Sequence, residues 1–130
     1  MPAPIHTLPL SLLPGTYAVC RLDSGSPVPH WALSGSFFSV TRTSDELSIV
    51  CEEAGVPEGV LCEGGWRCIK IEAALPFGLV GILVSVLQPL AEADVGIFAA
   101  STYDTDYILV KSGDLERATA ALTQAGHRFA

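Results

Sequence analysis

The sequence contains no asparagine and few basic residues. Without asparagine it has no acceptor for N-linked glycosylation. Its 130 residues include 7 Lys and Arg against 14 Asp and Glu, which gives a formal net charge of −7. Neutralising nucleic-acid phosphates requires clustered cations, and no two basic residues are adjacent here. The composition therefore argues against nucleic acid as a partner, and against anionic membrane surfaces for the same reason.

The sequence also lacks the motifs that mark many enzymes and metal sites. It has no G-x-S-x-G, no P-loop and no G-x-G-x-x-G, and its histidines stand apart from any nucleophile motif. No two cysteines form a C-x-x-C, and no histidine pair lies near them. The four are Cys20, Cys51, Cys62 and Cys68. Because free cysteine behaves as a small hydrophobe, we expect reduced, buried thiols. No catalytic activity, metal or cofactor is expected.

No stretch has the features of a secretory signal or a membrane span. Residues 1–13 carry no Lys or Arg, and prolines interrupt their apolar run. The most apolar segment, 73–90, is broken by two prolines and two glycines. We therefore expect a soluble, cytoplasmic protein. Its apolar content of 49% is high beside 16% charged residues, which favours a homodimer that buries additional surface.

The chain divides into two halves joined near Gly64-Gly65, which predicts modules over 1–63 and 64–130. In the first half, apolar runs between turn residues predict strands and one short helical turn. The strands are expected over 17–22, 37–41 and 47–51, and the helical turn over 30–33. Proline and four glycines in the segment 53–65 argue against a regular helix there.

The second half is more regularly patterned. Alternating apolar and polar residues predict a half-buried strand over 66–72. Apolar residues at spacings of three and four predict a helix over 79–93, in which Pro89 should kink or weaken the last turn. A strand over 95–100 follows, then a polar cluster and a second strand that ends at Lys111.

A final helix is expected after this hairpin. Ser112 is a plausible N-cap, acidic residues occupy the first turn, and Gly126 is the stop signal. Residues 127–130 could add a short edge strand. The order β-α-β-β-α-(β) predicts an α+β protein of two ferredoxin-like (βαββαβ) modules, the first with reduced helices. Each module would have an antiparallel sheet with helices on one face.

Two carboxylates, Asp104 and Asp106, occupy the expected hairpin tip. In a strand, side chains two residues apart point to the same face, so the pair could contact a ligand, hold a metal or perform acid–base chemistry. Aspartate at a turn also commonly caps backbone amides. The sequence leaves capping, ligand contact and metal or acid–base chemistry open, although no third metal-binding residue falls within the local motif.

The order of these elements resembles the ACT domain. The resemblance is carried by Gly81-Ile82 opening the helix, Pro89-Leu90-Ala91 ending it, and Ser-Thr-Tyr-Asp-Thr-Asp-Tyr-Ile-Leu-Val over 101–110. The pattern is closest to the branch that includes the CASTOR-type arginine sensors and small bacterial relatives. It covers residues 66–125, and the first half resembles the degenerate ACT-like module that such relatives place in front.

The resemblance implies that an amino acid binds between modules. Its carboxylate would meet the backbone amides of Gly81 and Ile82, where a helix N-terminus offers free N–H donors to an anion. The hairpin residues Thr102, Tyr103 and Asp106 would meet its cationic end, with Asp104 beside them. The arginine sensors enclose their ligand with bulky aromatic residues in this hairpin, whereas Thr105 is small. The resemblance therefore implies an amino acid as the ligand, basic ones included, without specifying arginine.

The function that follows is a non-catalytic sensor or regulatory protein that binds an amino acid and acts on an unidentified partner protein. The alternative is a scaffold whose ACT-like surfaces serve only dimerisation or protein interaction, without a ligand. A small enzyme would require clustered titratable groups with perturbed pKa values, a pattern that this sequence does not show.

Overall fold

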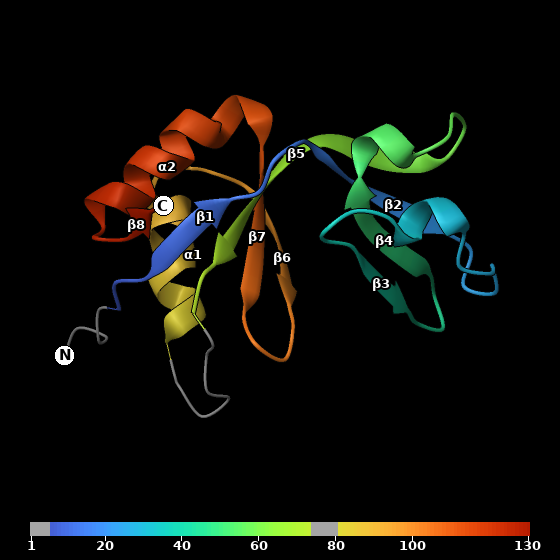
Figure 1. Cartoon of the computed structure of the whole chain (residues 1–130), viewed down its shortest axis with the longest axis horizontal. Coiled ribbons are helices and arrows are strands. Elements are labelled where there is room, and N and C mark those ends of the chain that lie inside the picture. The colour runs from blue at the N-terminus through green and yellow to red at the C-terminus, as the bar shows by residue number, and fades with distance from the viewer. Residues whose placement is uncertain (1–5, 74–80) are drawn as a thin grey trace. The chain divides into compact units, whose positions relative to one another are not determined.

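The computed structural model describes residues 6–73 and 81–130, and the chain divides into two compact units (Figure 1). The terminal unit comprises Met1–Pro14 and Arg67–Ala130, and the central unit comprises Gly15–Trp66. Strand β5 (Leu61–Ile71) contributes to both units, because its first residues pair with β2 (Tyr17–Leu22) and its last residues pair with β1 (Pro9–Leu12).

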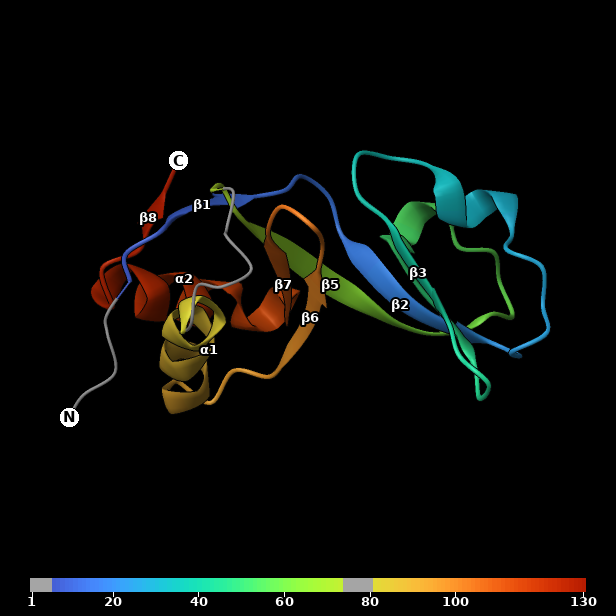
Figure 2. The same ribbon diagram turned by 90° about the horizontal axis from the view of Figure 1, so that it is seen from below.

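The terminal unit has a mixed sheet covered by two helices. Its further elements are β1 (Pro9–Leu12), α1 (Ile82–Glu92), β6 (Ile97–Ser101), β7 (Asp106–Lys111), η3 (Ser112–Asp114), α2 (Leu115–Gln124) and β8 (Arg128–Phe129). The strand order is β8-β1-β5-β7-β6, with β8 parallel to β1 and with β1–β5 and β6–β7 antiparallel. Both helices lie on one face of this sheet (Figure 2). The predicted α+β class is confirmed.

One apolar cluster joins the helices of the terminal unit to its sheet. The buried residues of α1 recur at spacings of four, which is the period of one helix face. Alternate residues of β5 and β7 supply the sheet side, since side chains along a strand point to opposite faces. The fully buried members of the cluster are Leu10, Ile69, Ile71, Val86, Leu90, Ile108, Val110, Ala118 and Leu122.

Helix α1 continues through Pro89 because a side chain satisfies the carbonyl that the proline leaves open. Proline has no N–H, so the C=O of Ser85, four residues earlier, loses its usual helical partner. Nε2 of His127 donates to that carbonyl at 2.8 Å, and Nδ1 of His127 accepts from the N–H of Leu8 at 3.1 Å. His127 is 2% exposed. It thereby connects α1 to the two ends of the described chain.

The central unit is a four-stranded antiparallel sheet without a full α-helix among its residues. Its strands are β2 (Tyr17–Leu22), β3 (Ser39–Arg42), β4 (Leu47–Glu52) and the first part of β5, in the order β3-β4-β2-β5. The sequence predicted reduced helices in this half of the chain. The structure has two 3-10 turns there, η1 (His30–Leu33) and η2 (Glu53–Gly55). Its core gathers Ala18, Cys20, Ala32, Leu47, Ile49 and Cys51.

The junction expected near Gly64-Gly65 is not a turn between elements, because both glycines lie inside β5. The register between β2 and β5 shifts between Tyr17 and Val19, and Gly65 adopts a left-handed φ of +75°. The N–H of Gly65 donates to Oε1 of Glu53 at 2.6 Å. A Cβ on Gly64 would approach the Glu53 carboxylate to 2.8 Å. The glycines are therefore required by an irregularity inside strand β5, and not by a turn at the end of the strand.

Other parts of the structure also differ from what the sequence predicts. Strand β1 was not predicted, since its proline-rich segment has no pattern of its own and is held by pairing with β5. Ser112 is not the N-cap of α2, because η3 precedes the helix and Asp114 takes the cap position. Cys62 is exposed instead of buried. The predicted helix over 79–93 begins at Ile82, and its residues 79 and 80 lie outside the described residues.

Within residues 6–73 and 81–130, no helix combines the length and the apolar character that crossing a membrane requires.

Candidate functional site

The β6–β7 hairpin holds four of the six predicted ligand-binding residues at its tip. Ser101 and Asp106 face each other as the last paired residues of the two strands. Beyond them, the N–H of Thr102 donates to the C=O of Thr105 at 2.9 Å, and Oγ1 of Thr102 donates to the same carbonyl at 3.0 Å. The turn that carries Tyr103 and Asp104 is therefore closed by its own threonine pair.

The two carboxylates have different surroundings. Asp106 is half-buried at the start of β7 and accepts a hydrogen bond from Oγ of Ser101 at 2.5 Å. Asp104 is exposed and lies in the bend outside β7. The same-face argument drawn from a strand therefore does not apply to the pair. The structure supports turn geometry at Asp104 and a positioned carboxylate at Asp106.

An open hollow of about 340 Å³ lies beside the tip. It is lined by Lys70, Ile71, Glu72, Ala73, Asp104 and Thr105. Nζ of Lys70 pairs with Oε1 of Glu72 at 2.9 Å. The hydrogen bond to Glu72, followed by electrostatic interactions with Tyr107, Glu72 and Asp104, raises the pKa of the partly exposed Lys70 above its ordinary value. The hollow therefore presents two carboxylates to a cationic group: that of Asp104, and that of Glu72, which is already paired with Lys70.

No group of three or more His, Cys, Asp or Glu side chains with metal-binding geometry occurs in the described part of the chain.

Thr105 fixes the hairpin tip to the neighbouring strand β5. Its side chain is 6% exposed, and its hydroxyl donates to the C=O of Ile71 at 2.7 Å. Replacing Thr105 by valine keeps the shape and leaves that carbonyl without its donor. We expect a loss of about 1–2 kcal/mol in the free energy of unfolding, measured by urea denaturation. Thr123→Val, an exposed threonine of α2, is the control and should stay within about 0.5 kcal/mol of wild type. Equal losses in both variants would contradict the anchoring role.

The start of α1 carries the other two predicted residues. Gly81 has a left-handed φ of +86° and directly precedes the helix, and Ile82 is its buried first residue. The first N–H groups of a helix have no partner within the helix and attract anions. In Figure 1, the start of α1 and the β6–β7 tip lie at the same end of the terminal unit. The structure therefore places all six predicted residues at one end of this unit.

His6 lies at this end as well, although no pattern in the sequence indicates it. Its Nε2 atom is buried without a hydrogen-bond partner and lies 3.9 Å from the position that a Cβ on Gly81 would occupy. The two residues are far apart in the chain, and His6 belongs to no motif. Only the folding of the N-terminal segment against the terminal unit brings an imidazole to the helix start.

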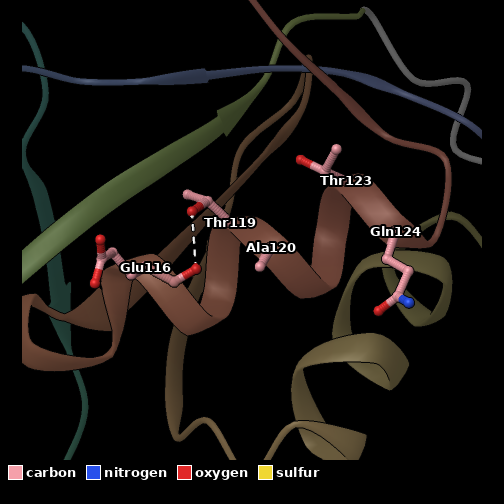
Figure 3. A pocket seen from close by; sticks show the side chains of 5 residues that line it. All are labelled: Glu116, Thr119, Ala120, Thr123 and Gln124. Carbon is pink, nitrogen blue, oxygen red and sulfur yellow. Dashed lines mark hydrogen bonds between the residues drawn. The ribbon is translucent and has the colours of Figure 1, made fainter.

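A second hollow lies along α2, away from these residues. Figure 3 shows Glu116, Thr119, Ala120, Thr123 and Gln124 lining it. The hydrogen bond drawn there runs from Oγ1 of Thr119 to the C=O of Glu116 at 3.1 Å, within the helix itself. This surface holds none of the predicted site residues, and its one charged lining side chain is a carboxylate.

Comparisons with known proteins identify the family. Residues 61–124 match the ACT domain model, and residues 15–59 match a model described only as an N-terminal domain. Protein Atu0741 from Agrobacterium tumefaciens, known from an X-ray structure, is 42% identical with a TM-score of 0.91, over 98% of this chain and 94% of that one. The chain belongs to the ACT domain family.

Two curated human proteins extend the relationship. Putative protein CASTOR3P is 31% identical over 100 residues, which is 67% of this chain and 61% of that protein. The cytosolic arginine sensor for mTORC1 subunit 1 is 32% identical over 99 residues, which is 68% of this chain and 30% of the sensor. The chain is therefore related to the CASTOR-type sensors, and the alignments span less than two thirds of each relative.

Proposed function

We propose that this protein is a non-catalytic regulatory protein that binds an amino acid at the end of the terminal unit formed by α1 and the β6–β7 hairpin. The observation that carries the proposal is the placement of a helix N-terminus and two hairpin carboxylates at the same end of this unit (Figure 1). An amino acid carries one anionic and one cationic group. The helix N-terminus complements the anionic group, and the hairpin carboxylates complement the cationic group. The relation to a named arginine sensor supports the same ligand class.

Each group of the ligand has a proposed partner. The carboxylate meets the free backbone donors at Gly81 and Ile82, with His6 beside them. The ammonium or a basic side chain meets Asp106, whose carboxylate is already oriented by Ser101, and Asp104 at the rim. Thr102 shapes the turn, and Tyr103, which is 79% exposed, covers the ligand.

An interaction scaffold is the second candidate. Val84 of α1 and Tyr103 are exposed at 52% and 79%, and the edge strand β6 carries no charged residue. An uncharged edge strand is suited to pairing with another chain. We propose a homodimer in either case, measurable by sedimentation, with a cytoplasmic location and a separate regulated protein as the recipient of the signal.

A thermal-shift screen of the purified protein against the twenty amino acids tests the binding proposal. A ligand present at 100 times its Kd adds about 2.7 kcal/mol to the stability of the folded state. For a chain of this length the unfolding midpoint should rise by roughly 10 °C. We expect one amino acid, or one chemical class, to produce such a shift. A flat screen on folded protein would contradict the sensor and favour the scaffold.

A pair of matched substitutions locates the site. Asp106→Asn retains an acceptor for Ser101 but removes the negative charge, so the shift caused by the ligand should fall by most of its size. Asp45→Asn makes the same change at an exposed position in the β3–β4 turn of the central unit and should leave the shift intact. Equal responses of the two variants would place the ligand elsewhere.

A further inference from the structure

Three cysteines share one face of the central sheet. Cys20 on β2 stands directly opposite Cys62 on β5, and Cys51 on β4 pairs with Ala18, two residues before Cys20. The alternation of a strand therefore puts all three side chains on the same face. Cys20 and Cys51 belong to the same buried cluster, and both Cys51 and Cys62 raise the pKa of the Cys20 thiol. The three strands lie side by side in Figure 1.

Solvent reaches these three thiols unequally. Cys20 is 2% exposed and Cys51 is 1% exposed, whereas Cys62 is an exposed residue at the edge of the cluster. An accessible thiol that stands beside a buried one is the arrangement in which a first modification is followed by a second thiol closing a disulfide. The fourth cysteine, Cys68, is buried in the terminal unit and takes no part in this cluster.

We propose that Cys62 is a modification site for low-molecular-weight disulfides, and that Cys20 resolves the adduct to form a Cys20–Cys62 disulfide linking β2 to β5. Residues directly opposite in an antiparallel pair have Cβ atoms roughly 4.5–5.5 Å apart, and a disulfide requires roughly 3.5–4.5 Å. A small local adjustment therefore suffices. A cross-strand disulfide closed in this way is reducible, so the modification is reversible.

The reaction balances in two exchange steps. The Cys62 thiolate attacks one sulfur of a small disulfide, the S–S bond of that molecule breaks, and one small thiolate leaves and takes up a proton. The Cys20 thiol then loses its proton and attacks the Cys62 sulfur. The bond between Cys62 and the adduct breaks, and the second small thiol leaves. Two protein thiols have been oxidised and one small disulfide has been reduced to two thiols.

The second step is the slow one at neutral pH. Burial, followed by the neighbouring Cys51 and Cys62, raises the pKa of the Cys20 thiol to about 12. These two are the titratable groups that face Cys20 from β4 and β5, and the remaining core around it is apolar. Because the thiolate is the attacking species, the adduct on Cys62 should accumulate before the disulfide closes. Raising the pH toward 9 should accelerate closure.

Intact-mass spectrometry of the folded protein with oxidised glutathione tests the proposal. The wild type should first gain one glutathione and then lose it, ending two hydrogen atoms lighter, and peptide mapping should join Cys20 to Cys62. Cys62→Ser should remain unmodified. Cys20→Ser should hold the glutathione adduct. Cys68→Ser is the control and should behave as wild type.

Each contrary result is decisive. Absence of any adduct on the folded wild type would overturn Cys62 as the entry point. A Cys51–Cys62 disulfide would overturn Cys20 as the resolving thiol. Because Cys20→Ser alters the core and could unfold the central unit, circular dichroism accompanies it. The wild-type mapping and the exposed Cys62→Ser variant decide the proposal even if Cys20→Ser fails to fold.

Discussion

His127→Ala is expected to lower the free energy of unfolding by about 2–5 kcal/mol. The substitution leaves two backbone groups unpaired: the buried N–H of Leu8 and the partly buried C=O of Ser85, whose helical donor is already missing at Pro89. Each unsatisfied buried group costs about 1–3 kcal/mol. Urea denaturation followed by circular dichroism measures the loss.

Two variants control this experiment. His30→Ala removes an exposed histidine of η1 and should change the unfolding free energy by less than about 0.5 kcal/mol. His127→Gln retains one donor and one acceptor and should recover part of the loss. If His127→Ala and His30→Ala proved equal, the imidazole would not be satisfying the α1 carbonyl in solution.

Leu90→Ala has the second large expected effect, a loss of about 2–5 kcal/mol. Leu90 is fully buried in the cluster that joins α1, α2 and the terminal sheet. Truncation removes apolar contacts and leaves a cavity that a packed interior fills only in part. The midpoint of chemical denaturation gives the loss directly, provided that the slope of the transition is unchanged.

Val84→Ala on the same helix is the matched control. Val84 is 52% exposed, and alanine is the better helix former, so a chain in which Val84 stays exposed to solvent should keep its unfolding free energy within about 0.5 kcal/mol of wild type. A large loss at Val84 would mean that this residue is buried in solution by another chain. That outcome would favour the homodimer, and the measured loss of unfolding free energy would then depend on protein concentration.

The elements with a strong local period were predicted closely. Helices α1 and α2 each bury apolar side chains at spacings of four residues, which is the period that their sequences show. Strand β1 has no such period. Pro9 and its neighbours are held by pairing with Leu61–Ile71, about sixty residues away, and a local pattern carries no information on a partner at that distance.

The residues of the candidate site also divide into those that the sequence predicts and one, His6, that it does not. Thr102, Tyr103, Asp104 and Asp106 could be predicted because turn residues between two strands mark a hairpin tip. Gly81 and Ile82 were predicted from the resemblance to the ACT domain, in which this position opens the helix. The partner of the helix start, His6, could not, since nothing near it in the chain indicates what it packs against. The roles of these residues in ligand binding remain predictions.

The sequence by itself determined the α+β class, the hairpin with its two carboxylates and the order of elements in the ACT domain, because each follows from local periodicity and turn chemistry. The tertiary structure alone decided that Pro89 is tolerated through His127, that Gly64 and Gly65 lie within a strand, and that Cys20 faces Cys62. These features depend on contacts between residues distant in the chain. Such contacts are set by packing and strand register, which local patterns do not encode.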